Sequence, residues 1–146
     1  TMPTSTLTLD GARRVLDAAI AHADAIGLAV CISVTDPSGE PIVSARMDGA
    51  PRLSAEIAAN KAWTVTSFKG LPTNAWWGIL EHEPALLHGI THTPRLTIFG
   101  GGVGVRVDGA LVGAIGVSGG SADEDTEIAT AGARALDRPD STGSLG

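Results

Sequence analysis

The chain has 146 residues, a hydrophobic content of 43% and a formal net charge of −6. This hydrophobic content excludes intrinsic disorder, and the acidic balance argues against binding to nucleic acid. There is no run of roughly 18 apolar residues, which argues against a membrane span. The single cysteine excludes an internal disulfide. We therefore expect a cytoplasmic protein with one domain over residues 1–146, comprising a core at 7–136 and a frayed C-terminal tail at 137–146.

In the first third of the chain, the pattern predicts one helix followed by a hairpin. Apolar residues recur every three or four positions over residues 9–26, which predicts a helix with Thr8 as its N-cap. Apolar and polar residues alternate over 28–35, which predicts a strand. A Pro- and Gly-containing turn at 36–39 then returns the chain as a second strand at 41–47.

The middle of the chain is less regular. A second helix is expected over residues 54–68, because Ile57, Val65 and Phe68 fall on one stripe. Residues 70–94 show no sustained period and are expected to be irregular. Within them, Pro84 opens a short helical turn that Gly89 closes.

The last third predicts a hairpin and a final helix at 121–136. Asp108-Gly109 lies between two apolar-rich runs and indicates a tight hairpin turn, since both positions tolerate positive φ. Strands are expected at 96–99, 103–107 and 110–117. The order of elements predicts an α+β layered domain with a five-stranded, mainly antiparallel sheet.

The chain contains five motifs that occur together in one known family. They are Val34-x-Asp36-x-x-Gly39, Arg46-Met47-Asp48-Gly49-Ala50, Lys61-Ala62, Phe99-Gly100-Gly101-Gly102 and the nine residues from Val112 to Gly120. With these motifs the chain resembles the GlcG/HbpS haem-binding family, which includes the C-terminal domain of the PduO cobalamin adenosyltransferases. The resemblance implies a profilin-like αβα sandwich that assembles into dimers or larger rings. It also implies a small-molecule ligand, which in some members is haem held by a histidine of the first helix.

His22 is the histidine that matches this role, and it lies at the edge of the apolar stripe of the first predicted helix. We consider it the candidate haem ligand. The alternative is a boundary histidine on a half-exposed helix. No other cofactor is expected.

Lys61 is anomalous because its helical angle places it within the stripe of Ile57, Val65 and Phe68. A buried lysine needs a partner or a lowered pKa. It would serve as a Schiff-base or general-base lysine, as a cation for an anionic ligand, or as one half of a structural ion pair. Glu56 is not its partner, because a spacing of five residues turns it away.

The irregular segment carries two further groups of side chains. Trp76 and Trp77 are adjacent and cannot both point into the core, so at least one is expected to stack on a flat ligand or to contact another subunit. His82, His88 and His92 have poor spacing for a metal site, and none is expected. One of them remains a candidate for a general acid or base.

An anion-binding group is also expected. Gly119, Gly120 and Ser121 precede the last predicted helix, where free N–H groups can hold a carboxylate. Arg46 and Arg106 lie on predicted strands and would add bidentate contacts to such an acid.

Three functional hypotheses follow. The first is a homo-oligomeric binding protein of the GlcG/HbpS type, holding haem or another planar ligand. The second is a cofactor-free isomerase, lyase or cyclase acting on a small carboxylate-bearing substrate, with Lys61, Glu56 or His88 as acid–base groups. The third is a purely structural oligomerisation domain.

Overall fold

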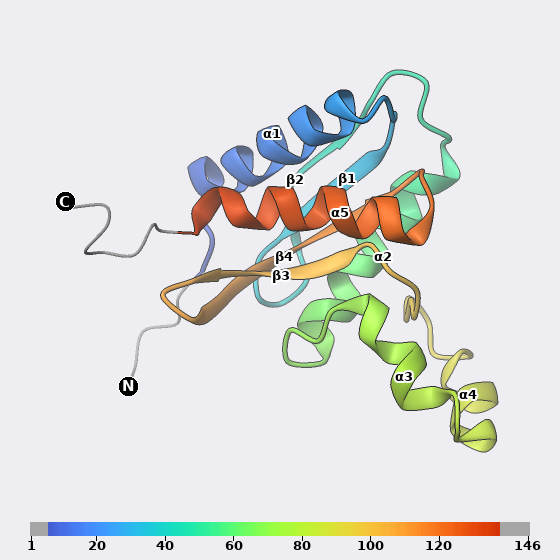
Figure 1. Cartoon of the computed structure of the whole chain (residues 1–146). Helices are drawn as coiled ribbons and strands as arrows, with labels where there is room; N and C mark the ends of the chain where they lie inside the picture. The colour runs from blue at the N-terminus through green and yellow to red at the C-terminus, as the bar shows by residue number, and fades with distance from the viewer. Residues whose placement is uncertain (1–5, 138–146) are drawn as a thin grey trace.

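The computed structural model describes residues 6–137 and shows a four-stranded antiparallel sheet in the order β2-β1-β4-β3. The strands are β1 (Cys31–Thr35), β2 (Pro41–Arg46), β3 (Gly102–Val107) and β4 (Ala110–Ser118). Helices α1 (Leu9–Ala25) and α5 (Ala122–Ala133) pack on one face of the sheet, and α2 (Leu53–Ser67) packs on the other (Figure 1). The predicted α+β class and layered arrangement are therefore confirmed.

The expected fifth strand at residues 96–99 is wrong. In the part of the chain that the structure describes, this segment has no strand partner, because its backbone turns towards α2 instead of the sheet. Arg95 adopts a positive φ of 69°, and the Thr97 N–H donates a hydrogen bond of 3.0 Å to Thr64 Oγ1 on α2. A short apolar run predicts a strand, but the strand forms only where its backbone finds hydrogen-bond partners in a sheet.

The N-terminal elements agree closely with the sequence pattern. The Thr8 side chain accepts a hydrogen bond of 3.0 Å from the Gly11 N–H, which caps α1 as expected. Gly27 follows the helix with a positive φ of 74°. In the turn between β1 and β2, the Asp36 carboxylate accepts hydrogen bonds from the backbone N–H groups of Ser38 and Glu40.

The main hydrophobic core lies between the sheet and the α1–α5 layer, and α2 packs very closely on the opposite face. A Cβ atom at Gly116 on β4 would overlap the carbonyl oxygen of Ala58 on α2. The main core comprises Leu7, Ala12, Val15, Ala19, Ala23, Val30, Ile32, Val34, Val105, Val112, Ile115, Val117, Ile128 and Ala129.

The segment expected to be irregular contains three short helical elements. They are η1 (Thr73–Ala75), α3 (Trp76–Leu80) and α4 (Pro84–Ile90). Pro84 opens α4 as expected, but Gly89 lies inside this helix, which continues to Ile90. None of the residues of α4 is buried, and α3 and α4 project away from the layered body (Figure 1).

The C-terminal hairpin and helix are also confirmed, with a shorter helix than expected. Asp108 and Gly109 both have positive φ, of 51° and 81°, between β3 and β4. Helix α5 ends at Ala133 and passes into the 3₁₀ helix η2 (Arg134–Leu136). The predicted tail lies outside the described residues except for Asp137. No helix of residues 6–137 is long and apolar enough to cross a membrane.

Candidate functional site

Lys61 is buried, as its position on the predicted stripe indicated. Its side chain is 1% exposed, and Nζ donates hydrogen bonds to the Val117 carbonyl oxygen at 2.8 Å and to Asp125 Oδ2 at 3.2 Å. Burial lowers the pKa of Lys61, and the Asp125 carboxylate opposes this shift. Of the three roles considered for Lys61, the geometry shows the ion pair.

Asp125, the partner of Lys61, lies in the first turn of α5, where acidic side chains accept hydrogen bonds from the backbone N–H groups that precede the helix. Ser121 and Glu124 form a capping box, in which the Ser121 N–H donates to Glu124 Oε1 at 2.9 Å. The Gly120 N–H donates to Asp125 Oδ1 at 2.8 Å. The N–H groups of Gly120 and Ser121, expected to be free for a ligand carboxylate, are therefore occupied by the chain's own acids. The spacing of Ser121 and Glu124 is the signal that predicts this capping box.

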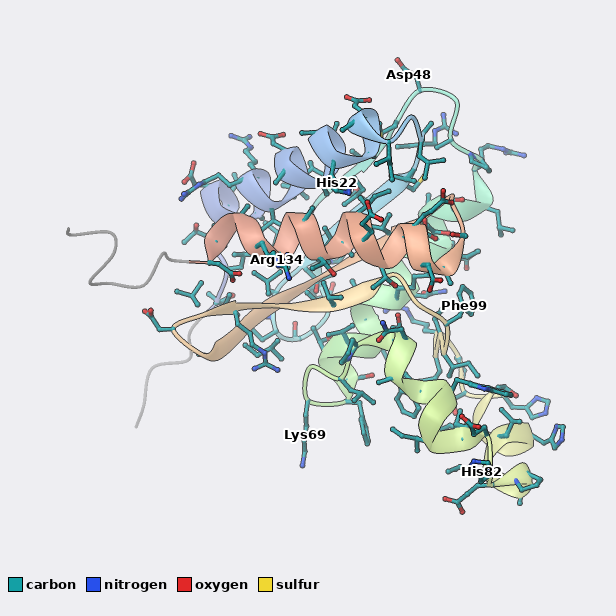
Figure 2. All side chains as sticks on the ribbon, in the orientation of Figure 1. His22, Asp48, Lys69, His82, Phe99 and Arg134 are labelled. Carbon is teal, nitrogen blue, oxygen red and sulfur yellow. The ribbon has the colours of Figure 1, made fainter. Side chains whose placement is uncertain are left out.

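A cleft lies beside this ion pair, between α3 and the segment that precedes β3. Its volume is about 440 Å³. The ring of Phe99 lines the cleft and covers Lys61, whose Nζ is 5.0 Å from the ring centroid. Phe99 is labelled in Figure 2, at the junction of the body and the projecting helices. The lining residues are Asn74, Trp77, Ile98, Phe99, Gly100, Ala122 and Asp123.

The two adjacent tryptophans divide between the core and this cleft. Trp76 is buried and packs on Phe68, with ring centroids 5.1 Å apart. Trp77 is 54% exposed and lines the cleft together with Phe99, which is 50% exposed. The sequence analysis singled out Trp77 but missed Phe99 as a site residue, although the Phe-Gly-Gly-Gly motif contains it.

The glycines after Phe99 allow the chain to pass over the ion pair. A Cβ atom at Gly101 would lie 2.5 Å from both Lys61 Nζ and the Val117 carbonyl oxygen. At Gly102 it would lie 2.8 Å from the Lys61 carbonyl oxygen. The glycine run thus brings the backbone against α2 and leaves the Phe99 ring at the surface.

His22 lies away from the cleft residues, at the contact between α1 and α5 (Figure 2). Its Nε2 atom is 2.6 Å from Glu127 Oε2 on α5, and the side chain is 32% exposed. One ring nitrogen of this candidate haem ligand therefore already has a carboxylate partner.

The proposed acid–base residues are not brought together. Lys61 is buried against β4 and α5, whereas Glu56 on α2 and His88 on α4 are both exposed. His82 lies at the end of the projecting helices and forms an exposed pair with Glu81 at 3.3 Å (Figure 2). Residues 6–137 contain no cluster of three potential metal ligands.

The expected anion-binding group is also dispersed. Arg46 is on β2 and Arg106 is on β3, which are the two opposite edges of the sheet. Neither arginine can therefore join the other around one acid at residues 119–121. A ligand contact by Arg46, Arg106 or Gly119 stays a prediction.

Comparison with known proteins identifies the family. The family model described as "Haem degrading protein HbpS-like" matches residues 7–134. An uncharacterized 15.0 kDa protein from the dhaT-dhaS intergenic region of Citrobacter freundii is 35% identical over 127 residues, covering 86% of this chain and 88% of the relative.

Solved structures support the same assignment. The crystal structure of Klebsiella pneumoniae protein ORFY is 33% identical, with a TM-score of 0.85 and coverage of 93% of this chain and 94% of that one. A crystal structure of a PduOC:haem complex is 31% identical, with a TM-score of 0.81 and coverage of 90% and 95%. The chain therefore belongs to the HbpS-like family, as its motifs indicated.

Proposed function

We propose that this protein binds a planar conjugated ligand, with haem as the first candidate, in the cleft between α3 and residues 98–100. The observation that carries the proposal is that Trp77 and Phe99, two large half-exposed aromatic side chains, line the same cleft. Its volume of about 440 Å³ falls in the usual range for small-molecule sites, about 300–1,000 Å³. Flat ligands stack favourably on such rings.

Contacts with α2 fix the position of Phe99. The Lys61 ammonium contacts the buried side of the ring, and the glycine segment behind it packs against α2. Because this side of the cleft is already ordered, it loses little conformational entropy when a ligand binds. A haem complex of a relative 31% identical to this chain supports a tetrapyrrole as the ligand to test first.

The fit of haem differs between its macrocycle and its iron. The cleft lining supplies aromatic and apolar side chains for the macrocycle, but no histidine, cysteine or methionine for the iron. His22 would have to release Glu127 before its Nε2 could bind a metal. The proposal therefore rests on stacking, and it predicts that metal-free protoporphyrin IX binds as well as haemin.

The test uses both ligands and a matched pair of variants. Phe99→Ala is expected to weaken binding of haemin and of protoporphyrin IX by about tenfold, since an aromatic contact contributes about 0.5–1.5 kcal/mol beyond its buried area. Phe68→Ala is the control, because Phe68 is 51% exposed but does not line the cleft. Absorbance and tryptophan-fluorescence titrations give both affinities.

A different set of results would indicate that the ligand binds at α1. If His22→Ala abolishes the haemin spectrum, protoporphyrin IX fails to bind and Phe99→Ala binds haemin normally, the ligand lies at the α1–α5 contact and not in the cleft. The alternative of an isomerase, lyase or cyclase has less support. Its acid–base candidates Lys61, Glu56 and His88 do not share a site, and Lys61 is occupied by Asp125.

A further inference from the structure

We propose that a second, smaller site at the β2 edge of the sheet binds a short-chain monocarboxylate, between the Arg46 guanidinium and the Ser33 hydroxyl. This site is separate from the aromatic cleft and does not depend on the ligand proposed there. Its evidence is a hollow of suitable size, a buried hydroxyl without a partner, and an arginine without a carboxylate.

The hollow forms where α2 leaves the edge of the sheet uncovered. In the antiparallel pairing of β1 and β2, Cys31 lies opposite Arg46 and Ser33 lies opposite Ser44. Residues that are directly opposite share a face, so these four side chains lie on one side of the sheet. The hollow has a volume of about 230 Å³, and Ala55 of α2 forms part of its wall.

Among the residues that line this hollow, Ser33 gives the strongest indication of a ligand. Its side chain is 3% exposed, and its Oγ atom has no hydrogen-bond partner among the described residues. A buried hydroxyl without a partner destabilises the protein, and native structures rarely retain one without a reason. A ligand oxygen would satisfy it by accepting a hydrogen bond from the hydroxyl.

Arg46 supplies the charge. It is exposed, lines the same hollow, and takes part in none of the ion pairs formed within residues 6–137. A planar guanidinium binds a planar carboxylate through two parallel hydrogen bonds. One positive charge balances one negative charge, and the chain's net charge of −6 disfavours anions of higher charge.

The rest of the hollow selects for a small ligand with a short apolar part. Pro41 and Ala55 present apolar surface next to the polar groups. The volume is below the usual range for drug-sized ligands, about 300–1,000 Å³, and about half that of the aromatic cleft. These features favour an acid such as acetate or propionate over a planar tetrapyrrole.

Cys31 provides a built-in reporter, because it is the only cysteine of the chain and lines the same hollow. Its Sγ atom donates to the Pro51 carbonyl oxygen at 3.8 Å. Burial raises the pKa of the thiol, with Arg46 opposing, so alkylation is best followed in mildly alkaline buffer. The thiolate sulfur displaces iodide and forms an S–CH₂ bond, and the thiol proton passes to the buffer.

The first experiment compares alkylation of Cys31 by iodoacetate, a monocarboxylate, and by iodoacetamide, its neutral analogue. We expect iodoacetate to react faster than iodoacetamide, although the acidic protein repels anions in general. Propionate, as a competing monocarboxylate, should slow the reaction with iodoacetate. Arg46→Gln should lower the ratio of the iodoacetate rate to the iodoacetamide rate by at least about tenfold, equivalent to about 1.4 kcal/mol. Arg106→Gln, on the other edge strand, is the matched control and should leave the ratio unchanged.

A second measurement covers the case in which Cys31 is too buried to react. Acetate is titrated into the ¹⁵N-labelled protein, and saturable amide shifts are expected at Ser33, Ser44 and Arg46. Ser33→Ala should fold at least as stably as the parent, because it removes an unpaired buried hydroxyl, yet bind acetate more weakly. A purely structural serine would not give this combination.

Three results would overturn the proposal. They are the absence of saturable shifts with acetate, unchanged acetate binding in Arg46→Gln, and saturation by inorganic phosphate but not by acetate. The last would indicate a phosphate site and not a carboxylate site.

Discussion

Lys61→Met tests whether the buried ion pair stabilises the fold or only occupies space within it. Methionine has a similar length and no charge, so it fills the cavity without supplying a donor. The substitution removes the hydrogen bonds of Nζ to Val117 and to Asp125. Asp125 is 2% exposed, and of its side-chain partners within residues 6–137 only the Gly120 N–H then remains.

The expected cost follows from this geometry. Removing one partner of a buried pair leaves an uncompensated charge, and this destabilises proteins by about 3–5 kcal/mol. Adding Asp125→Asn removes that charge while an amide oxygen can still accept the Gly120 N–H. The double variant should therefore recover most of the lost stability. Urea denaturation of the parent, both single variants and the double variant gives the coupling energy of the pair.

The pH dependence has a definite sign. Because burial lowers the pKa of Lys61, the unfolded chain binds a proton more tightly at this residue than the folded chain does. The unfolding free energy of the parent should therefore rise, relative to Lys61→Met, as the pH increases from the lowered pKa towards 10.5, the ordinary pKa of a lysine.

Two results would refute this reasoning. One is a loss of less than about 1 kcal/mol in Lys61→Met, which is no more than an average point substitution. The other is a double variant no more stable than the single one. Either would mean that Asp125 does not depend on Lys61 in the folded protein.

Two further predictions concern packing and assembly. Gly116→Ala should cost more than the usual overpacking range of about 1–3 kcal/mol, because its Cβ would overlap the Ala58 carbonyl oxygen. Gly78→Ala should be tolerated, because a Cβ there has no neighbour within 4 Å among residues 6–137 apart from the adjoining backbone of its own helix. Urea denaturation measures both variants. We also predict a homo-oligomer, since Ile79 and Leu86 on the projecting helices are 45% and 40% exposed, and a monomer at micromolar concentration in sedimentation equilibrium would contradict this.

Much of the local structure could be predicted because its causes are local. The capping hydroxyl of Thr8, the positive φ values at Asp108 and Gly109, and the periodicity over residues 9–26 act within one or two turns of chain. Contiguous motifs such as Phe99-Gly100-Gly101-Gly102 likewise indicated the family before any contact was known. The anomaly of Lys61 was also visible, since it depends only on helical angle.

The remaining features depend on residues that are distant in sequence. Lys61 and Asp125 are 64 positions apart, and nothing in the spacing of either predicts the other. Residues 96–99 have the composition of a strand, but the Thr97 N–H donates to Thr64 on α2, and the segment pairs with none of the four strands of the sheet.

The candidate sites show the same division. Sequence could propose Trp77 and Arg46 as ligand contacts, because an exposed aromatic or an arginine is recognisable by type. It could not place Phe99 opposite α3 or set Ser33 beside Arg46, since these contacts exist only after the sheet has its register and α2 has packed on it. Local chemistry therefore determined the elements and the family, and the packing of distant segments decided which side chains meet.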